Sequence, residues 1–122
     1  MKELPHIPDS EREIMLAIWE EGQGVTSDIL MKKLNKSWKR TTLLNLLTRL
    51  CERGFLSCEK QGKINIYTSL VKQEDYLREE SVNFLQKLHH NSLASLVASL
   101  YDGNAISKED LQELEKFVKE AK

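Results

Sequence analysis

The 122-residue sequence contains few of the residues that interrupt helices or staple small domains: 5 Gly, 2 Pro and 2 Cys. The shortage of Gly and Pro, together with abundant Leu, Glu and Lys, favours a mostly helical protein. Cys51 and Cys58 are too few for a disulfide framework, and their spacing is not that of a C-x-x-C redox or zinc motif. We therefore expect a reducing, cytoplasmic environment.

Long apolar runs are also missing, because no stretch approaches the ~20 residues of a membrane span. The N-terminal segment MKELPHIPDSERE lacks the apolar stretch of a secretory signal, so we expect no membrane insertion. The sequence shows no Gly-rich phosphate loop, no G-x-S-x-G and no H-E-x-x-H motif. We expect no enzymatic activity, no cofactor and no metal site. His89 and His90 are adjacent on a helix and cannot chelate one ion together, so a helix-end or interface role is expected.

The formal net charge of −1 conceals a strong segregation of charge along the chain. The net charge is −5 over residues 1–31, +7 over residues 32–63 and −3 over residues 64–122. A basic segment between two acidic ones fits either a solvated basic face or a nucleic-acid site, and the local structure must decide between them.

Apolar periodicity predicts three helices in the first half of the chain. Ser10-x-x-Glu13 matches a capping box that would start the first helix, which Gly22 and Gly24 would end. Its apolar face holds Ile14, Met15, Ile18 and Trp19, with Trp19 in the core. A short second helix should begin at Thr26 or Ser27, end near residues 35–36, and bury Ile29, Leu30 and Leu34.

The third predicted helix has two contrasting faces. One face carries Leu43, Leu46, Leu47 and Leu50 at i, i+3, i+4 and i+7, and Gly54 should end the helix. The other face carries hydrogen-bond donors: Thr41, Thr42, Asn45, Thr48, Arg49 and Arg53. Trp38 should pack at the turn before this helix, and Cys51 and Cys58 are expected as small core or partly buried thiols, with oxidation of an exposed Cys58 as a minor alternative.

Alternating residues after Gly54 predict two strands joined by a turn at Gln61-Gly62, with Lys60 and Lys63 at the tip. Three helices followed by a hairpin are typical of a winged helix-turn-helix, whose third helix enters the major groove of DNA. We therefore predict that the donor face contacts double-stranded DNA. Mainly sequence-independent attraction is expected from four further cations: Lys39, Arg40, Lys60 and Lys63.

Residues 72–122 predict a second, strandless domain after a winged-helix domain of residues 1–71. Asp102-Gly103-Asn104 should break its helices, and Ser107 should cap the last one. About 50 residues are too few to close a sufficient core alone, so we expect a second copy of the chain to cover the apolar stripes. These predicted dimerisation residues are Tyr76, Leu77, Phe84, Leu85, Leu88, Leu93, Leu96, Val97, Leu100, Leu111, Leu114, Phe117 and Val118.

Five segments in order resemble the BlaI/MecI/CopY repressors of Gram-positive bacteria, whose founding members control penicillinase and methicillin-resistance genes. They are IPDSEREIMLAIW (7–19), WKRTTLLNLLTRLCERGFL (38–56), IYTSLV (66–71), EDYLREES (74–81) and FLQKLHHNSLASLVASL (84–100). The resemblance implies a winged-helix N-terminal domain, a helical C-terminal dimerisation domain, and repression by a homodimer on a palindromic operator. By this resemblance, the recognition helix corresponds to residues 38–53, in which Thr42, Thr48 and Arg49 match the family pattern.

Three departures from the family pattern affect specificity and regulation. The family usually has Ser-Pro-Lys where this chain has Lys39-Arg40-Thr41, and a polar residue at Leu44, so we expect a family-like operator with altered bases. A membrane sensor protease cleaves antibiotic-linked members at an Asn-Phe bond, and the corresponding bond here, Ser99-Leu100, lacks that motif. The copper-responsive branch carries a C-x-C motif, whereas this chain has no cysteine after Cys58.

The sequence thus predicts a mainly α protein that acts as a homodimeric, DNA-binding transcriptional repressor. The alternative is a winged-helix module that binds protein and not specific DNA. A steep dependence of binding on salt and a preference for one DNA sequence distinguish the first from the second.

Overall fold

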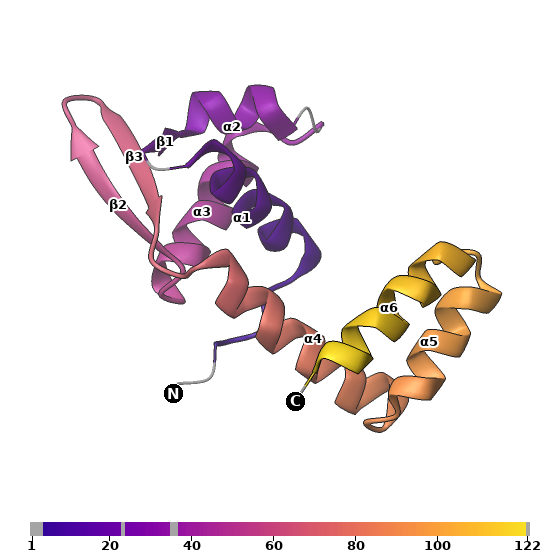
Figure 1. Cartoon of the computed structure of the whole chain (residues 1–122). Coiled ribbons are helices and arrows are strands. Elements are labelled where there is room, and N and C mark those ends of the chain that lie inside the picture. Colours follow the sequence, from indigo (N-terminus) through magenta and orange to yellow (C-terminus); the bar gives the residue numbers. More distant parts are fainter. Residues whose placement is uncertain (1–3, 23, 35–36, 122) are drawn as a thin grey trace. The chain divides into compact units, whose positions relative to one another are not determined.

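The computed structural model describes residues 4–22, 24–34 and 37–121 and is mainly helical (Figure 1). The elements follow in the order α1 (Asp9–Glu21), β1 (Val25–Thr26), α2 (Ser27–Leu34), α3 (Arg40–Glu52), β2 (Leu56–Gln61), β3 (Ile64–Ser69), α4 (Gln73–His89), α5 (Leu93–Asp102) and α6 (Lys108–Glu120). The chain divides into two compact units, Met1–Glu80 and Ser81–Lys122, which we call unit 1 and unit 2. The division falls within α4, further along the chain than the boundary at residues 71 and 72 that we expected from the sequence.

The core of unit 1 is built where α1, α2 and α3 pack together against the base of the sheet. The predicted leucine face of α3 is confirmed, because all four leucines are buried. Gly54 follows α3 with φ +83°, a left-handed conformation that favours glycine, and the Phe55 amide then donates to the Leu50 carbonyl at 3.0 Å. This reversal directs the chain from α3 into β2.

The predicted hairpin is confirmed, with two differences in detail. β2 and β3 pair antiparallel with Gln61 opposite Ile64, so the central turn residues are Gly62 and Lys63 and not Gln61 and Gly62. Gly62 has φ +64° at the first central position, the conformation that a type II′ turn requires there. The unpredicted strand β1 pairs Val25 with Tyr67 and completes a sheet of order β1-β3-β2.

The predicted capping box at Ser10 is wrong. α1 begins at Asp9, one residue earlier, with Pro8 at the N-cap and no side-chain capping bond. Ser10 therefore already lies within the first turn, and the Arg12 amide donates to the Pro8 carbonyl at 2.9 Å. Gly22 is the C-cap of α1, as predicted.

The predicted apolar face of α2 is only partly correct. α2 begins at Ser27 as predicted and buries Leu30, whereas Ile29 is 40% exposed because it lies on the outer side of this short helix. Leu34 packs partly buried against the core. The predicted end of this helix at residues 35–36 lies outside the described residues.

The first turns of α4 belong to unit 1. Tyr76, which we expected among the dimerisation residues, is only 2% exposed and is a core residue of unit 1. Its ring packs against Trp19 at 5.4 Å and edge-on against Phe55 at 6.0 Å between ring centroids. Trp19 is partly buried, and its indole N–H donates to the Ser69 hydroxyl and the Val71 carbonyl. The partly buried Trp38 also packs against the core, as expected.

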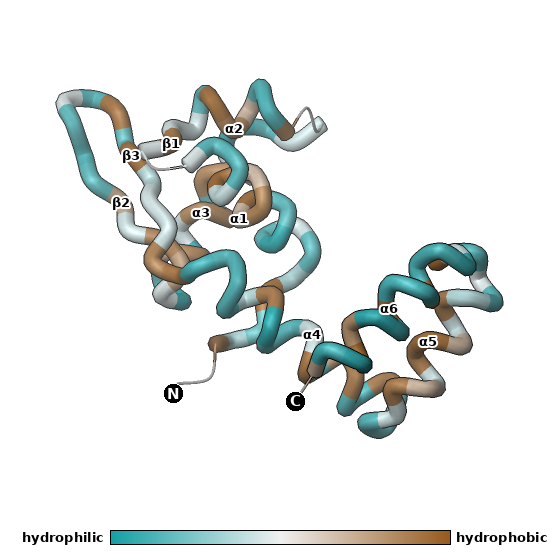
Figure 2. The backbone as a smooth tube through the Cα atoms, in the orientation of Figure 1, coloured by the Kyte–Doolittle hydropathy of each residue, from teal (hydrophilic) through white to brown (hydrophobic). Residues whose placement is uncertain are grey.

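Unit 2 comprises the end of α4 with α5 and α6, and within its described residues no side chain of α5 or α6 is buried. The predicted break after Asp102 and the cap at Ser107 are confirmed, since Ser107 and Asp110 form a complete capping box. His89 ends α4, where its Nδ1 lies 2.9 Å from the Ser95 hydroxyl. Figure 2 shows α5 as largely hydrophobic and α6 as largely hydrophilic.

Large apolar side chains remain exposed throughout unit 2: Val82, Phe84, Leu88, Leu93, Leu100, Tyr101, Phe117 and Val118. Leu77, on the part of α4 that belongs to unit 1, is also 49% exposed. No helix in the described part of the chain is long and apolar enough to cross a membrane.

Candidate DNA-binding surface

The donor face of α3 is exposed, as helical periodicity requires opposite a buried leucine face. The exposed donors are Thr41, Thr42, Asn45, Thr48, Arg49 and, at the C-cap, Arg53. The Thr48 hydroxyl donates to the Leu44 carbonyl one turn earlier at 2.9 Å, so its proton is already used within the helix. Leu44 itself is half-buried and packs on the core.

Arg49 and Asn45 lie one turn apart on this face, and neither side chain bonds to any described residue. Lys39, Lys60 and Lys63 are likewise exposed and make no ion pair with the described part of the chain. We call Lys39, Arg49, Lys60 and Lys63 the unpaired cations. Each of these charges could bind an anionic ligand without first breaking an internal ion pair.

Arg40 is exposed but engaged. Its guanidinium donates to the Ser27 hydroxyl at 3.1 Å and to the Asp28 carboxylate at 2.5 Å, which joins the start of α3 to the start of α2. Both charged groups are more than half exposed, so this ion pair contributes about 0–1 kcal/mol to stability. An incoming phosphate could therefore displace Asp28 at low cost.

Arg53 is held much more firmly. Its guanidinium pairs with Glu11 of α1, a carboxylate that is 0% exposed. The second carboxylate oxygen of Glu11 has no hydrogen-bond partner among the described residues. If Arg53 turned to a DNA phosphate, Glu11 would remain as an uncompensated buried charge.

Lys33 is a third basic residue with internal partners. Its ammonium lies 3.0 Å from Glu20 and 3.1 Å from Glu21, and these hydrogen bonds raise the pKa of Lys33. Lys33, Arg40 and Arg53, which we call the paired cations, thus neutralise part of the +7 segment through acidic residues of α1 and α2.

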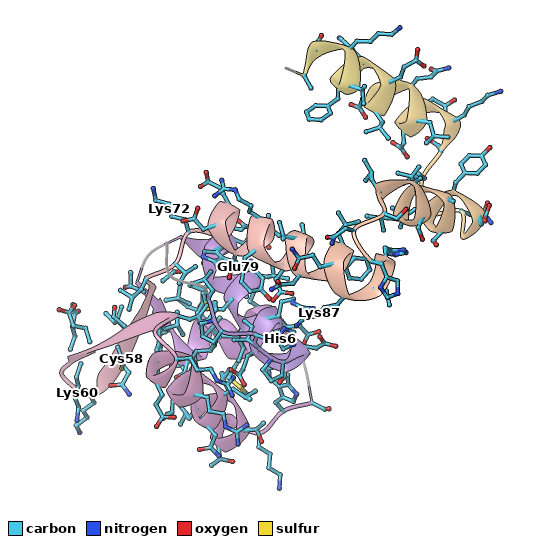
Figure 3. All side chains as sticks on the ribbon, turned by 90° about the horizontal axis from the view of Figure 1, so that it is seen from below. His6, Cys58, Lys60, Lys72, Glu79 and Lys87 are labelled. Carbon is cyan, nitrogen blue, oxygen red and sulfur yellow. The ribbon has the colours of Figure 1, made fainter. Side chains whose placement is uncertain are left out.

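The hairpin presents Lys60 and Lys63 at its free end, and Figure 3 shows Lys60 directed away from the helices of unit 1. Lys60 lies opposite Asn65 in the ladder, and Lys63 is in the turn. Cys58, which we expected to be at least partly buried, is exposed because only the first residue of β2 is buried in the core. Cys51 is half-buried as expected, and burial raises the pKa of its thiol.

Sequence reasoning missed the acidic partners of these cations. One signal was available for Glu11, which precedes Ile14 by three residues and Met15 by four and therefore lies on the apolar face of α1. No comparable signal identifies Glu20, Glu21 or Asp28, because their partners Lys33 and Arg40 are distant in the sequence.

The bond between Ser99 and Leu100 lies inside α5. Both residues are exposed, with Leu100 at 37%. The bond is therefore accessible on the surface but held in helical conformation. The described residues contain no cluster of three or more side chains suited to hold a metal ion.

Comparisons with known proteins agree with this architecture. The chain is 32% identical over 124 residues to the penicillinase repressor of Bacillus licheniformis, covering 100% of this chain and 96% of that protein. It is 31% identical over 109 residues to the methicillin resistance regulatory protein MecI of Staphylococcus aureus strain N315, covering 88% of this chain and 89% of that one. Its structure resembles the solution structure of monomeric Bacillus licheniformis BlaI in complex with the blaP half-operator. That match has a TM-score of 0.52 and 32% identity and covers 62% of this chain and 94% of the solved one. The family model described as penicillinase repressor matches residues 7–120, and the chain therefore belongs to the penicillinase repressor family.

Proposed function

We propose that this protein represses transcription by binding, as a homodimer, a DNA operator made of two half-sites. The observation that carries the proposal is the exposed donor face of α3 next to a hairpin that bears lysines. A relative at 32% identity with the same fold is solved in complex with a half-operator, which supports DNA binding by this fold. Binding to DNA would place the protein in the cytoplasm.

Asn45 and Arg49 are the side chains best placed to distinguish bases. Both are exposed on α3, and neither has a partner in the described structure. An amide pairs well with adenine and a guanidinium with guanine in the major groove, whereas a threonine hydroxyl is less selective. Thr41 and Thr42 would then serve mainly as contacts to the DNA backbone, whereas the Thr48 hydroxyl already donates to the Leu44 carbonyl and would need to break that bond first.

Lys39, Lys60 and Lys63, the three lysines among the unpaired cations, would supply the attraction to phosphates that does not depend on sequence. Lys39 precedes α3, and Lys60 and Lys63 extend from the hairpin of β2 and β3. We assign Arg40 a conditional role, since it must exchange Asp28 for phosphate, and we remove Arg53 from the proposed DNA contacts because Glu11 holds it. Three unpaired lysines per protomer give a salt slope on the order of −5 for a dimer, from about −0.9 per phosphate neutralised.

The exposed apolar side chains of unit 2 support the homodimer. α5 and α6 carry no buried residue, although their sequences contain regular apolar stripes. A second copy of the chain would bury these stripes, and a dimer matches an operator with two-fold symmetry.

We infer that a membrane sensor protease could act at Ser99-Leu100 only after local unfolding. The bond lies in the last turn of α5 and lacks the Asn-Phe motif of the antibiotic-linked relatives. Opening a helix requires its hydrogen bonds to break first. Regulation of this chain by that route would therefore be slower than for a chain with the motif in an exposed loop.

The decisive experiment is a selection of genomic DNA fragments by the purified full-length protein at about 100 mM salt. We expect enrichment of fragments that share an inverted repeat, with half-sites about one helical turn or a multiple apart. Affinity for the selected duplex should exceed that for random competitor DNA and fall steeply between about 50 and 200 mM salt. If no fragment is enriched, the protein is better described as a winged-helix module that binds protein.

A further inference from the structure

The first two turns of α4 are held on unit 1 by a set of polar contacts that DNA binding does not explain. The Arg12 Nε–H donates to the Tyr76 hydroxyl at 2.8 Å, and Arg12 Nη2 lies 3.4 Å from the Glu80 carboxylate. Arg12 comes from α1, whereas Tyr76 and Glu80 come from successive turns of α4. We call these three residues the α4 anchor.

The anchor is partly enclosed and therefore more specific than a surface ion pair. The Tyr76 side chain is buried against Trp19 and Phe55, so its hydroxyl has few directions in which to find a partner. The hydrogen bond with Tyr76 is the main cause that raises the pKa of Arg12. Asp9 also pairs with Arg12, at 3.1 Å, and thereby orients its guanidinium.

The segment that precedes α1 adds two further contacts to the same helix. The Leu4 amide donates to the Glu79 carboxylate at 3.0 Å, and His6 Nδ1 lies 3.5 Å from the Glu80 carboxylate. His6 and Glu79 are among the side chains labelled in Figure 3. The fully buried Ile7, directly after His6, holds the segment in place. The start of α4 is thus fixed from two sides, by α1 and by the N-terminal segment.

These contacts end at Glu80, where unit 1 also ends, but α4 continues without a break to His89. An α-helix bends only gently unless proline, glycine or an inserted group interrupts it, and residues 73–89 contain neither proline nor glycine. The anchor therefore holds the first two turns of α4 on α1 within unit 1. A dimer on two half-sites needs two copies of α3 about 34–36 Å apart or a multiple of that distance, whereas one half-site sets no such requirement.

We propose that Arg12, Tyr76 and Glu80 are positioning residues that fix how α4 leaves the winged-helix unit, and so match the two recognition helices of a dimer to a two-half-site operator. The proposal rests on the proposed function, since it requires DNA binding by a homodimer. It assigns a role in operator binding to residues that would not touch DNA.

The test compares the affinity of the full-length protein for two duplexes: the inverted repeat recovered by the genomic selection and a single half-site from it. Arg12→Met keeps the aliphatic stem and removes both contacts to α4. We expect it to weaken binding to the full operator on the order of tenfold, which is part of the roughly 10²–10⁴-fold gain in affinity that two linked binding sites can provide. Affinity for the half-site should change less than about twofold.

The control is Arg78→Met, the same substitution on α4 at an arginine whose ion pair is with Asp75 of the same helix. It should leave both affinities unchanged. Tyr76→Phe removes the hydroxyl but keeps the ring between Trp19 and Phe55, and it should reproduce the selective loss if Arg12→Met does not fold.

Equal losses of affinity for the two duplexes would overturn the proposal, because they would show that the anchor only stabilises the DNA-binding unit. Unchanged affinity for both duplexes would overturn it as well. Failure of the wild-type protein to bind its half-site would instead contradict the proposed function, so the two failures are distinguishable.

Discussion

Arg49 and Arg53 are one turn apart at the end of α3, yet their surroundings give them different roles. Arg49 is exposed, and its side chain has no partner among the described residues, whereas Arg53 is tied to the buried Glu11. The two arginines look equivalent in the sequence because both lie on the donor face. The difference between the unpaired Arg49 and the paired Arg53 depends on a carboxylate that lies 42 positions from Arg53 in the chain.

Arg49→Ala and Asn45→Ala should each weaken binding to the operator by about 1–3 kcal/mol, because each would remove a contact to a base edge. The measurement is titration of labelled operator and of random duplex at one salt concentration. Lys63→Ala is the control, since loss of a phosphate contact weakens both duplexes alike. If Arg49→Ala also weakened both equally, Arg49 would be a phosphate anchor and not a specificity residue.

Arg53→Met should destabilise unit 1 by about 2–3 kcal/mol, because it leaves the Glu11 carboxylate buried without a counter-charge. The expected loss is smaller than the ~3–5 kcal/mol of a fully enclosed pair, since the Arg53 side chain is 36% exposed. Urea unfolding followed by circular dichroism measures it. Arg49→Met is the matched control and should change stability by less than about 0.5 kcal/mol. Equal stabilities of the two variants would show that the Glu11 pair contributes nothing.

At the scale of elements, α1 and α6 show that similar sequence motifs can give different N-caps. Ser10 and Ser107 are each followed three residues later by an acidic side chain. Only Ser107 accepts the amide of the third helical residue, Asp110, at 3.1 Å, because Pro8 already starts α1 before Ser10.

Ser107→Ala should therefore destabilise α6 by about 1 kcal/mol, the usual contribution of a serine N-cap. Ser10→Ala should cause no capping loss, since the Ser10 hydroxyl makes no capping bond in α1. Thermal unfolding of the two variants in the same buffer compares them directly. A larger loss from Ser10→Ala than from Ser107→Ala would contradict the assigned caps.

Local periodicity was sufficient to predict the elements that repeat a pattern over several turns. The leucine face of α3, the hairpin and the three C-terminal helices could be predicted from the regular spacing of apolar residues that are close together in the sequence. The two-residue strand β1 was missed because it has no pattern of its own and exists through pairing with β3. Ile29 was misplaced because an eight-residue helix buries too narrow a face for its full stripe.

The candidate site was predictable in outline for the same reason. The sequence places the donors of α3 on one face, but the ion pairs of Arg40 and Arg53 join residues 12 and 42 positions apart. Such pairs depend on tertiary packing, which local periodicity does not encode. Tyr76 was assigned to the dimer interface because it lies on an apolar stripe. Such a stripe predicts that a side chain is buried, but it does not say which unit buries it, and Tyr76 lies in the core of unit 1.

At the scale of the whole molecule, the exposed apolar side chains of unit 2 predict a dimer that one charge can disrupt. Phe117→Glu places a carboxylate on a side chain that is 67% exposed in the single chain and apolar in the proposed interface. We expect sedimentation of this variant as a monomer at micromolar concentration, with the helical content retained.

Leu70→Glu is the matched control for that experiment. Leu70 is 62% exposed but lies in unit 1, between β3 and α4, and its variant should remain a dimer. If Phe117→Glu remained a dimer too, α6 would lie outside the interface. If both variants were monomers, the interface would not be confined to unit 2.

The pairing of Lys33, Arg40 and Arg53 with acidic residues would affect how many copies of the repressor a cell needs to occupy its operator. A genome offers about 10⁶–10⁹ competing non-specific sites. Each cation that attracts DNA regardless of sequence increases the fraction of repressor bound to those sites. Because part of the basic charge is neutralised within the protein, fewer copies would be sequestered on bulk DNA. The internal ion pairs would thus allow a small pool of repressor to keep a single operator occupied.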